Sequence, residues 1–388
     1  MSSSLRIEVR EGLREIDAGE WDDCAGSNNP FLLHAFLVAL EENGCVGSST
    51  TWRPQHLVIY RGDRLVGAVP LYLKFDSYGE YVFDWAWAQA YERAGMQYYP
   101  KLVAAIPFTP VSGKRFLVAP GEDFAEIAGL LMDGALQHAR QLKVSSLHWL
   151  FTSQQDTQLL AHHNHLRRTG YQFHWFNDNY ESFDDFLASF SSAKRKKIKR
   201  ERRHVREAGV SLTIVEGRDV TDELWNRFYA FYRSTIECRG AIPYLNPGFF
   251  RQIGRTMADK IVLVLASHED EYVAGALNLK GDDTLYGRYW GSVGEFNSLH
   301  FETCYYRAIE YCIDKCLTRF EAGAQGEHKL SRGFLPNKTW SAHWLRHPEF
   351  TRAVSEFLDR EHQGIEHHVN VLQSHSPFRQ PDKTSGDD

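Results

Sequence analysis

The chain has 388 residues, of which 43% are hydrophobic and 24% charged, the balance of a globular protein that buries real cores. At roughly 100–200 residues per domain, this length predicts two domains. The net charge of −6 argues against a chain that binds nucleic acid through its bulk charge. We find no signal peptide and no membrane segment, which needs roughly 18 apolar residues in a row. The six cysteines are therefore expected to be reduced thiols of a cytoplasmic protein.

The first half begins with a predicted helix, Glu20–Asn43, whose apolar residues recur at spacings of three to four. His56–Tyr60 and Leu65–Lys74 have the composition of strands, and the short turn at Arg61-Gly62-Asp63 predicts a hairpin. The later segments are predicted as a strand, a Pro-interrupted loop, an amphipathic helix and two strands: Tyr81–Trp87, Lys101–Val118, Phe124–Leu142, Ser146–Phe151 and Tyr171–Phe176.

The second half repeats this order of elements. It is predicted to contain a helix, a hairpin, a third strand, a helix and two strands: Asp222–Ile236, Ile261–Ala266 with Tyr272–Lys280, Thr284–Trp290, Phe301–Leu317, Arg319–Ala322 and Ser341–Leu345. A repeat of roughly half the chain indicates a duplicated domain, since solenoid repeats are much shorter. We predict one domain over 1–180, a second over 181–373 and a disordered polar tail over 374–388.

This order predicts an α/β (α+β) protein with mixed sheets flanked by helices. It resembles the acyl-CoA N-acyltransferase (GNAT) fold, present twice. Several phrases, among them FEAGAQGEHKLSRGF, are similar to the FemAB-like "peptidoglycan biosynthesis/recognition" family: Gly79–Leu102, Pro107–Leu117, Tyr272–Gly291, His300–Ile313 and Phe320–Phe334. The resemblance extends over roughly the whole chain, from Leu5 to Phe378.

The resemblance implies an activity as well as a fold. FemAB-type enzymes add amino acids to peptidoglycan precursors, so it implies an N-acyltransferase or aminoacyltransferase that moves an activated group onto an amine. Acyl-CoA and aminoacyl-tRNA are the candidate donors, and a lipid-linked cell-wall precursor is a candidate acceptor. A non-catalytic module that recognises peptidoglycan precursors or another anionic polymer is the alternative.

The segment Glu321–Phe334 is the strongest candidate site. It groups titratable side chains around three glycines, after a strand that would bring it to the end of a sheet. Acyl transfer to an amine needs a base, because the attacking nitrogen must be neutral. The predicted acid–base residues are Glu321, Glu327 and His328. The predicted substrate-binding residues are Gln325, Lys329 and Arg332, of which the last two can hold a carboxylate or phosphate. A polar loop held by internal salt bridges is the alternative.

The turn after Thr284–Trp290 is the second candidate. In the GNAT fold the pyrophosphate of coenzyme A lies where the fourth strand meets the next helix, and a helix N-terminus suits an anion. The predicted cofactor-binding residues are Gly291, Ser292 and Gly294, with Tyr289 and Trp290 at the substrate. The family pattern Gln/Arg-x-x-Gly-x-Gly/Ala is absent, which fits an aminoacyl-tRNA donor better than coenzyme A. A glycine-rich turn without a ligand is the alternative.

The segment Lys194–Arg206 places nine basic residues against one acid, Glu201, with Ser191 and Ser192 before it as candidate N-caps. A helix of this composition attracts phosphate, from a tRNA backbone, a lipid pyrophosphate, an anionic membrane surface or coenzyme A. The predicted substrate-binding residues here are Lys194 and Lys197. A solvated helix paired with acids elsewhere is the alternative.

An aromatic stretch, Asp84–Tyr99, is the last candidate. It could line a groove for a peptide or sugar, with Trp87, Glu92 and Arg93 as predicted substrate-binding residues, although core packing explains it equally well. Two histidine clusters, at 162–165 and 361–368, lack the further ligands that the spacing of a zinc site would fix, so we predict no metal site.

Overall fold

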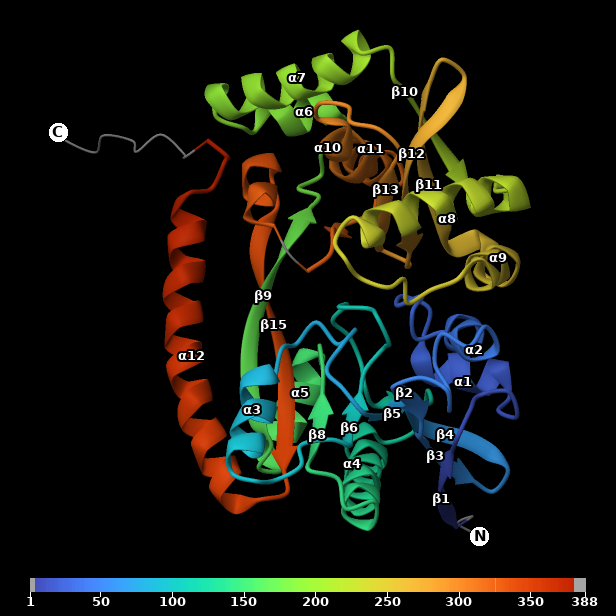
Figure 1. The fold of residues 1–388 in the computed structure, drawn as a ribbon, viewed down its shortest axis with the longest axis vertical. Coiled ribbons are helices and arrows are strands. Elements are labelled where there is room, and N and C mark those ends of the chain that lie inside the picture. The colour runs from blue at the N-terminus through green and yellow to red at the C-terminus, as the bar shows by residue number, and fades with distance from the viewer. Residues whose placement is uncertain (1–3, 325, 380–388) are drawn as a thin grey trace, which may run out of the picture. The chain divides into compact units, whose positions relative to one another are not determined.

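The computed structural model describes residues 4–324 and 326–379 (Figure 1). Within these residues the chain divides into two compact units, each made of separate segments. Unit 1 takes residues up to 171 together with 242–260 and 338–366. Unit 2 takes 172–241, 261–337 and the residues from 367 onward.

Unit 1 contains two sheets. The smaller one has the strand order β1-β3-β4-β7 and is antiparallel: Leu5–Arg10, His56–Arg61, Arg64–Val69 and Leu117–Val118. The other has the order β15-β8-β6-β5-β2: Leu335–Leu345, Ser146–Trp149, Lys101–Ala104, Leu71–Lys74 and Trp52–Pro54. Its only parallel pair is β6 and β8, which helix α4 (Phe124–Gln141) connects. Parallel strands require such a crossover.

Helix α4 forms because its sequence carries both a cap and an apolar face. The side chain of Asp123 accepts a hydrogen bond from the backbone nitrogen of Glu126, which caps the N-terminus. Ile127, Leu131 and Ala135 then recur every four residues and are fully buried. They pack into one apolar cluster with strand residues such as Leu102, Leu147, Ile59 and Val66.

The opposite face of β6, β8 and β15 is polar. Val103 lies opposite His148, and His148 lies opposite His343, so Lys101, two residues before Val103, shares their face. Helix α3 (Trp85–Arg93) covers this side, since the ring of Trp87 lies 6.0 Å from that of His148 and 4.9 Å from that of His343. One sheet therefore carries an apolar core on one face and buried polar residues on the other.

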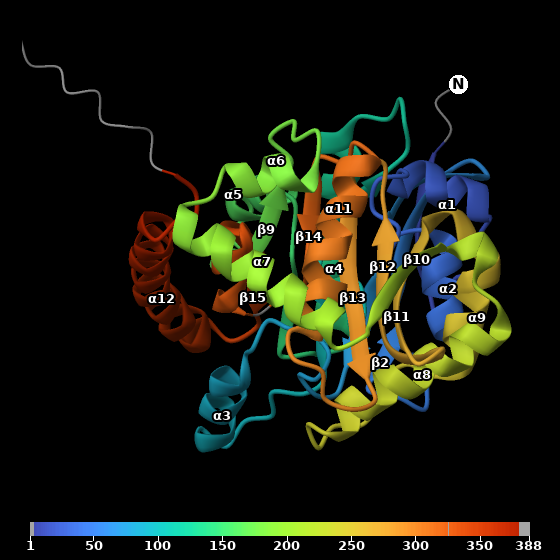
Figure 2. The ribbon, with the colours of Figure 1, turned by 90° about the horizontal axis from the view of Figure 1, so that it is seen from above.

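Unit 2 repeats this plan with the strand order β10-β11-β12-β13-β14-β9: Ser211–Glu216, Ile261–His268, Glu271–Lys280, Thr284–Ser292, Arg319–Glu321 and Leu166–Phe176. The pair β13 and β14 is parallel and the other pairs are antiparallel. The crossover contains three consecutive helical segments: α10 (Leu299–Phe301), a π-helical turn (Glu302–Tyr306) and α11 (Arg307–Asp314). Figure 2 shows α11 against β13 and β14.

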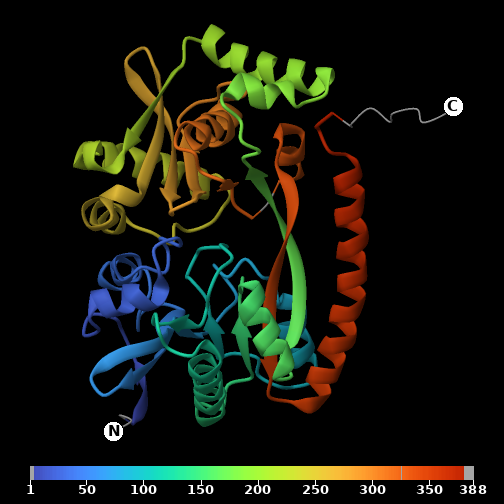
Figure 3. The same cartoon turned by 180° about the vertical axis from the view of Figure 1, so that it is seen from behind.

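The remaining helices are α1 (Ala18–Ala25), α2 (His34–Glu42), α5 (Gln154–His162), α6 (Phe183–Ala188), α7 (Ser192–Glu207), α8 (Asp222–Glu237), α9 (Pro247–Thr256) and α12 (Pro348–Ser374), with 3-10 turns at Gly217–Asp219, Ala258–Lys260 and Glu327–Arg332. Helix α12 is one continuous helix of 27 residues (Figure 3).

The predicted order of mixed sheets flanked by helices occurs in both units. The last strand of each unit comes from the other half of the chain, because β15 contributes 338–345 to unit 1 and β9 contributes 172–176 to unit 2. The compact units are therefore not contiguous in the sequence. The domains 1–180 and 181–373 were inferred from the duplication in the sequence and stay a prediction. The predicted tail, 374–388, lies outside the described residues from 380 onward.

Several predicted elements were wrong in detail. Glu20–Asn43 is two helices, because Gly26 ends α1 with a φ of 75° and Pro30 follows. Leu65–Lys74 is divided at Pro70, which lacks a backbone N–H, into β4 and β5 of different sheets.

The segment around Asp84 also differs from the prediction. Tyr81–Trp87 is not a strand, since Trp87 and Tyr91 form the buried face of helix α3, which begins at Trp85. Lys101–Val118, predicted as a loop, begins with β6 and ends with β7.

The glycine at position 291 gives a test of how closely helix α8 packs on β13. A Cβ there would lie 1.8 Å from the backbone oxygen of Phe231, whereas a Cβ at Gly129 in α4 would meet nothing within 4 Å. We expect Gly291→Ala to lower the free energy of unfolding by about 1–3 kcal/mol. The control Gly129→Ala should raise it by about 0.5–1 kcal/mol, because alanine favours helix. Urea unfolding followed by circular dichroism measures both, and an unchanged Gly291→Ala midpoint would contradict this packing.

Candidate functional site

In unit 2, the parallel strands β13 and β14 pair over only three residues. Thr284, Leu285 and Tyr286 pair with Arg319, Phe320 and Glu321, whereas β13 continues to Ser292. A β-bulge interrupts β13 one residue later, because Leu277 pairs with Tyr289 and Asn278 with Gly287. The segment after Glu321 leaves the sheet through Gly323, Gly326 and Gly333, whose φ angles of 82°, 112° and 91° favour glycine.

Glu321 ends β14 as a buried carboxylate, 3% exposed. Neither of its oxygens has a hydrogen-bond partner within the described part of the chain. Oε1 lies 3.3 Å from Nε of Arg319, and Oε2 lies 3.9 Å from Nε2 of His174. Burial raises the pKa of Glu321 to about 7, although Arg319 and Arg288 oppose the rise. This carboxyl group therefore changes charge near neutral pH.

Lys329 is a second titratable group with an unusual pKa. Its side chain is buried, and Nζ donates a hydrogen bond to the backbone oxygen of Gly323 at 2.9 Å. Burial lowers its pKa to about 8. Burial lowers the pKa values of His174, His300 and His328, and the charge of Lys329 adds to the lowering in all three.

His328 is an exposed residue of the same segment. Its Nε2 lies 3.0 Å from the hydroxyl of Tyr305, and its ring lies 6.3 Å from that of His300. Burial and the nearby cations lower the pKa of His300 to about 4. We call the six residues described so far the unit 2 cluster: Glu321, His174, His300, Tyr305, His328 and Lys329. Tyr305, His300 and His174 were not predicted from the sequence.

The other predicted residues of the segment have different surroundings. Arg332 is buried, stacks on the ring of Phe301 at 3.4 Å and donates a hydrogen bond to Glu201 at 2.8 Å. Glu327 is 63% exposed and lies 3.3 Å from Nε2 of His368. Gln325 lies outside the described residues. Arg332 thus has partners within the protein, and Glu327 faces solvent.

The predicted cofactor-binding turn follows β13. Trp290 stacks edge-on against His300 at 5.3 Å, which links it to the unit 2 cluster, and Tyr289 contacts Tyr232 at the same distance. Gly291 is required by the close approach of α8. The backbone oxygen of Ser292 accepts a hydrogen bond from Ser234, and Gly294 has a φ of 83°. Cofactor binding by these residues stays a prediction.

The predicted basic helix is α7. Its buried residues are Ile198, Val205 and Glu201, which accepts hydrogen bonds from Tyr306 and Arg332. Ser191 occupies the N-cap position without a side-chain cap. The cations lie elsewhere on the helix, and Lys194 and Lys197 are half-exposed. A concavity of about 450 Å³ is lined by Ala193, Lys196, Lys197, Lys199, Arg200 and Arg203.

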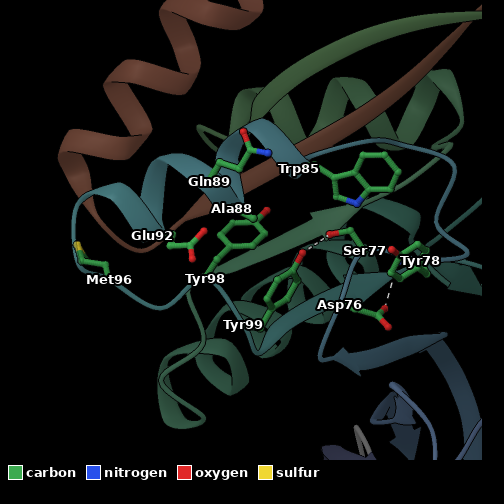
Figure 4. A pocket seen from close by; sticks show the side chains of 10 residues that line it. All are labelled: Asp76, Ser77, Tyr78, Trp85, Ala88, Gln89, Glu92, Met96, Tyr98 and Tyr99. Carbon is green, nitrogen blue, oxygen red and sulfur yellow. Dashed lines mark hydrogen bonds between the residues drawn. The ribbon is translucent and has the colours of Figure 1, made fainter.

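In unit 1, helix α3 and the segments beside it line a pocket of about 560 Å³ (Figure 4). Glu92 lines it, as do Trp85 and Tyr99 of the same predicted aromatic stretch. Trp87 is instead buried against the two histidines of the sheet, and Arg93 is exposed without lining the pocket. The binding roles predicted for these three residues stay untested.

Behind this pocket lies a buried network of charges. Nζ of Lys101, fully buried, donates to Ser77 and Glu80 at 2.9 Å and to Asp84 at 2.5 Å. Burial alone would lower the pKa of Lys101, but the two carboxylates hold it above its usual value. Burial raises the pKa of Glu80 to about 7. Burial would also raise that of Asp84, but Lys101 holds it well below its usual value.

The network continues through aromatic and imidazole groups. The hydroxyl of Tyr98 donates to Asp84 at 2.5 Å and lies 3.2 Å from Nε2 of His148. Nδ1 of His148 lies 2.6 Å from Nδ1 of His343. Burial lowers the pKa of His148 to about 3, so both rings are neutral at pH 7. The sequence carried one signal for this network, a lysine or histidine inside a short apolar strand. Lysine is almost never fully buried unless it is paired, so its position in such a strand indicates a buried partner.

This network predicts a large loss of stability when its cation is removed. We expect Lys101→Met to lower the free energy of unfolding by about 3–5 kcal/mol, because Glu80 and Asp84 would be left buried without a counter-charge. The control Lys114→Met removes the same charge from an exposed position and should change stability little. Chemical denaturation measures both, and equal effects of the two substitutions would contradict the network.

The family described as peptidoglycan biosynthesis/recognition (FemAB-like) matches residues 12–380. Among solved structures, FemX is similar over 88% of this chain and 99% of its own, with 13% identity and a TM-score of 0.55. L-PGS from Bacillus licheniformis is similar over 86% and 98%, with 12% identity and a TM-score of 0.50.

A tandem GNAT protein from the clavulanic acid biosynthesis pathway covers 89% of this chain and 99% of its own, with 13% identity and a TM-score of 0.47. Comparison with curated proteins gave no match. The family match and the likeness to FemX confirm the predicted tandem GNAT-like fold. Within the described residues, none of the helices has the length and apolar character to cross a membrane.

Proposed function

Since the chain belongs to the FemAB-like family of peptidoglycan biosynthesis/recognition proteins, we propose that it transfers an activated acyl or aminoacyl group onto an amine at the unit 2 cluster. The acceptor is an amine of a peptidoglycan precursor. A cytoplasmic location, as expected from the sequence, belongs to this proposal.

The observation that carries the proposal is the early separation of β13 and β14. Their pairing ends at Tyr286 and Glu321, and the segment that carries His328 and Lys329 follows directly in the chain, with Nζ of Lys329 bonded back to the oxygen of Gly323. Ligands commonly bind where neighbouring parallel strands diverge at their carboxyl ends. The bulge in β13 lies at the same place, and bulges are frequent beside active sites.

The cluster supplies the proton transfers that acyl transfer to an amine needs. Glu321, with a pKa of about 7, takes a proton from the acceptor ammonium, so that the neutral nitrogen attacks the acyl carbon. The new N–C bond forms as the bond from the acyl carbon to the sulfur or oxygen of the carrier breaks. The carrier leaves with a proton from the Tyr305 hydroxyl, the candidate donor, which lies 3.0 Å from Nε2 of His328, and the second proton that the nitrogen loses on becoming an amide restores this hydroxyl. No covalent enzyme intermediate is needed.

The basic helix α7 favours aminoacyl-tRNA over a free thioester as the donor. Its cations line a concavity, and rows of exposed cations bind nucleic-acid backbones in a sequence-independent way. The anionic headgroups of a membrane or a lipid-linked precursor share this chemistry.

The proton-transfer role of Glu321 makes a specific prediction. Transfer by the wild type should rise with pH to a plateau, with a midpoint near 7, because only the ionised carboxylate accepts a proton and burial raises the pKa of Glu321 to about 7. We expect Glu321→Gln to lower kcat roughly 100-fold or more and to remove this pH dependence, with little change in KM. Steady-state transfer assays between pH 5.5 and 8.5 measure both.

The matched control is Glu223→Gln, an exposed position in the first turn of α8, which should keep wild-type kinetics. A Glu321→Gln variant with the wild-type pH profile would remove this residue from the mechanism and leave the other members of the unit 2 cluster as candidates.

The role of α7 is tested through salt. Alanine at Lys196, Arg200 and Arg203 should weaken binding to tRNA and reduce the slope of log K against log salt by about 2–3, because about one counterion is released per phosphate contact. A control triple removes the same charge from exposed positions of unit 1: Lys114, Lys143 and Arg352. Filter binding from 50 to 200 mM salt measures both slopes, and equal losses in the two triples would contradict a specific role for α7.

A further inference from the structure

The pocket of unit 1 has an unusual combination of walls. Trp85 and Tyr78 are 47% and 61% exposed although both are large aromatic residues. With Tyr98 and Tyr99 they give the pocket four aromatic residues (Figure 4). Exposed aromatic surface gathered in a concavity is typical of a binding site and is not needed for the core.

The charges that line the pocket are acidic. It contains no lysine, arginine or histidine, and its two carboxylates are those of Asp76 and Glu92. Asp76 is neutralised by Nζ of Lys74 at 2.6 Å. Within the described part of the chain the Glu92 carboxylate makes no ion pair or side-chain hydrogen bond, and Figure 4 shows it directed toward Tyr98.

The buried charges behind the wall of the pocket do not change its acidic character. Lys101 lies under Ser77, but Asp84 and Glu80 hold its ammonium at 2.5 and 2.9 Å. The hydroxyls of Ser77 and Tyr99 bond to each other at 2.8 Å, and Ser77 also accepts from Lys101. The pocket therefore offers an anionic group and aromatic faces, and few polar groups remain for a ligand with many hydroxyls.

This composition discriminates between ligand classes. An anion would meet Glu92 with no cation to hold it. A purely apolar ligand would remove water from the Glu92 carboxylate without replacing it, which is unfavourable. An ammonium group on an aliphatic chain suits both the carboxylate and the aromatic walls of the pocket. The ammonium pairs with the carboxylate and is attracted to aromatic faces, while the chain contacts the rings.

We propose that the unit 1 pocket is a binding site for aliphatic primary ammonium groups, such as the end of a lysine-like side chain, with Glu92 as the anionic partner and Trp85 as the main aromatic wall. The inference goes beyond the proposed transfer reaction. It concerns binding alone and holds whether or not unit 2 catalyses transfer.

Calorimetric titration of the full chain with n-hexylamine tests the proposal, with 1-hexanol as the neutral analogue of equal length. We expect saturable binding of hexylamine at one site and binding of hexanol at least roughly fivefold weaker. Glu92→Gln should weaken hexylamine binding roughly threefold to fivefold without affecting hexanol. Trp85→Ala should weaken both, because it removes the wall that the chain contacts.

The matched control is Glu15→Gln, an exposed carboxylate elsewhere in unit 1, which should leave binding unchanged. Both pocket side chains are exposed, so thermal melts are expected to show folded variants. Equal affinity for hexanol and hexylamine, or unchanged amine binding in Glu92→Gln, would overturn the proposal. Tighter binding of N-acetylglucosamine than of hexylamine would also overturn it and assign the pocket to sugars. Since no donor is present, failure here is distinct from failure of the transfer reaction.

Discussion

A short parallel pair of strands is the constraint on which the rest of each unit depends. The pair is β6 with β8 in unit 1 and β13 with β14 in unit 2, and in both it lasts for three residues. Parallel strands need a crossover, so each pair has a helix packed on one face of its sheet. The other face of each sheet is then left to other side chains, and it carries a buried titratable residue in both units, Lys101 in unit 1 and Glu321 in unit 2.

The two units treat these titratable residues differently. In unit 1 the charge of Lys101 is matched by two carboxylates through short hydrogen bonds, so the network is expected to stabilise the fold and the wall of the pocket. In unit 2 the Glu321 carboxylate has no hydrogen bond in the described residues, and the Lys329 ammonium bonds to a backbone oxygen. Burial without full compensation moves the pKa values of Glu321 and Lys329 to about 7 and 8. Groups that titrate near neutral pH are suited to proton transfer.

The sequence was sufficient for the fold class, the duplication and the family, because strand and helix periodicity and the quoted phrases are local signals. It was insufficient where long-range contacts decide. Asp84 pairs with Lys101, and helix α3 begins directly after Asp84, where a strand was expected. No local pattern in the sequence shows that β9 and β15 each contribute residues to the unit formed mainly by the other half of the chain. The compact units could therefore not be predicted from the sequence boundary near residue 180. For the site, Glu321, His328 and Lys329 were predicted, whereas Tyr305, His300 and His174 come from other elements. Arg332 was predicted to bind substrate, yet Glu201, over 100 residues away in sequence, already pairs with it.

The central claim is that this FemAB-like chain forms an amide between an activated acyl or aminoacyl group and an amine. The most direct measurement is a transfer assay in which a labelled donor, either aminoacyl-tRNA or acyl-CoA, is mixed with the chain and an amine-bearing peptidoglycan precursor, and the product is identified by mass spectrometry. The account predicts a precursor whose mass has increased by the acyl or aminoacyl group, with its amine converted to an amide. Tight binding of the precursor with no amide formed from either donor class would contradict the account and support a recognition module.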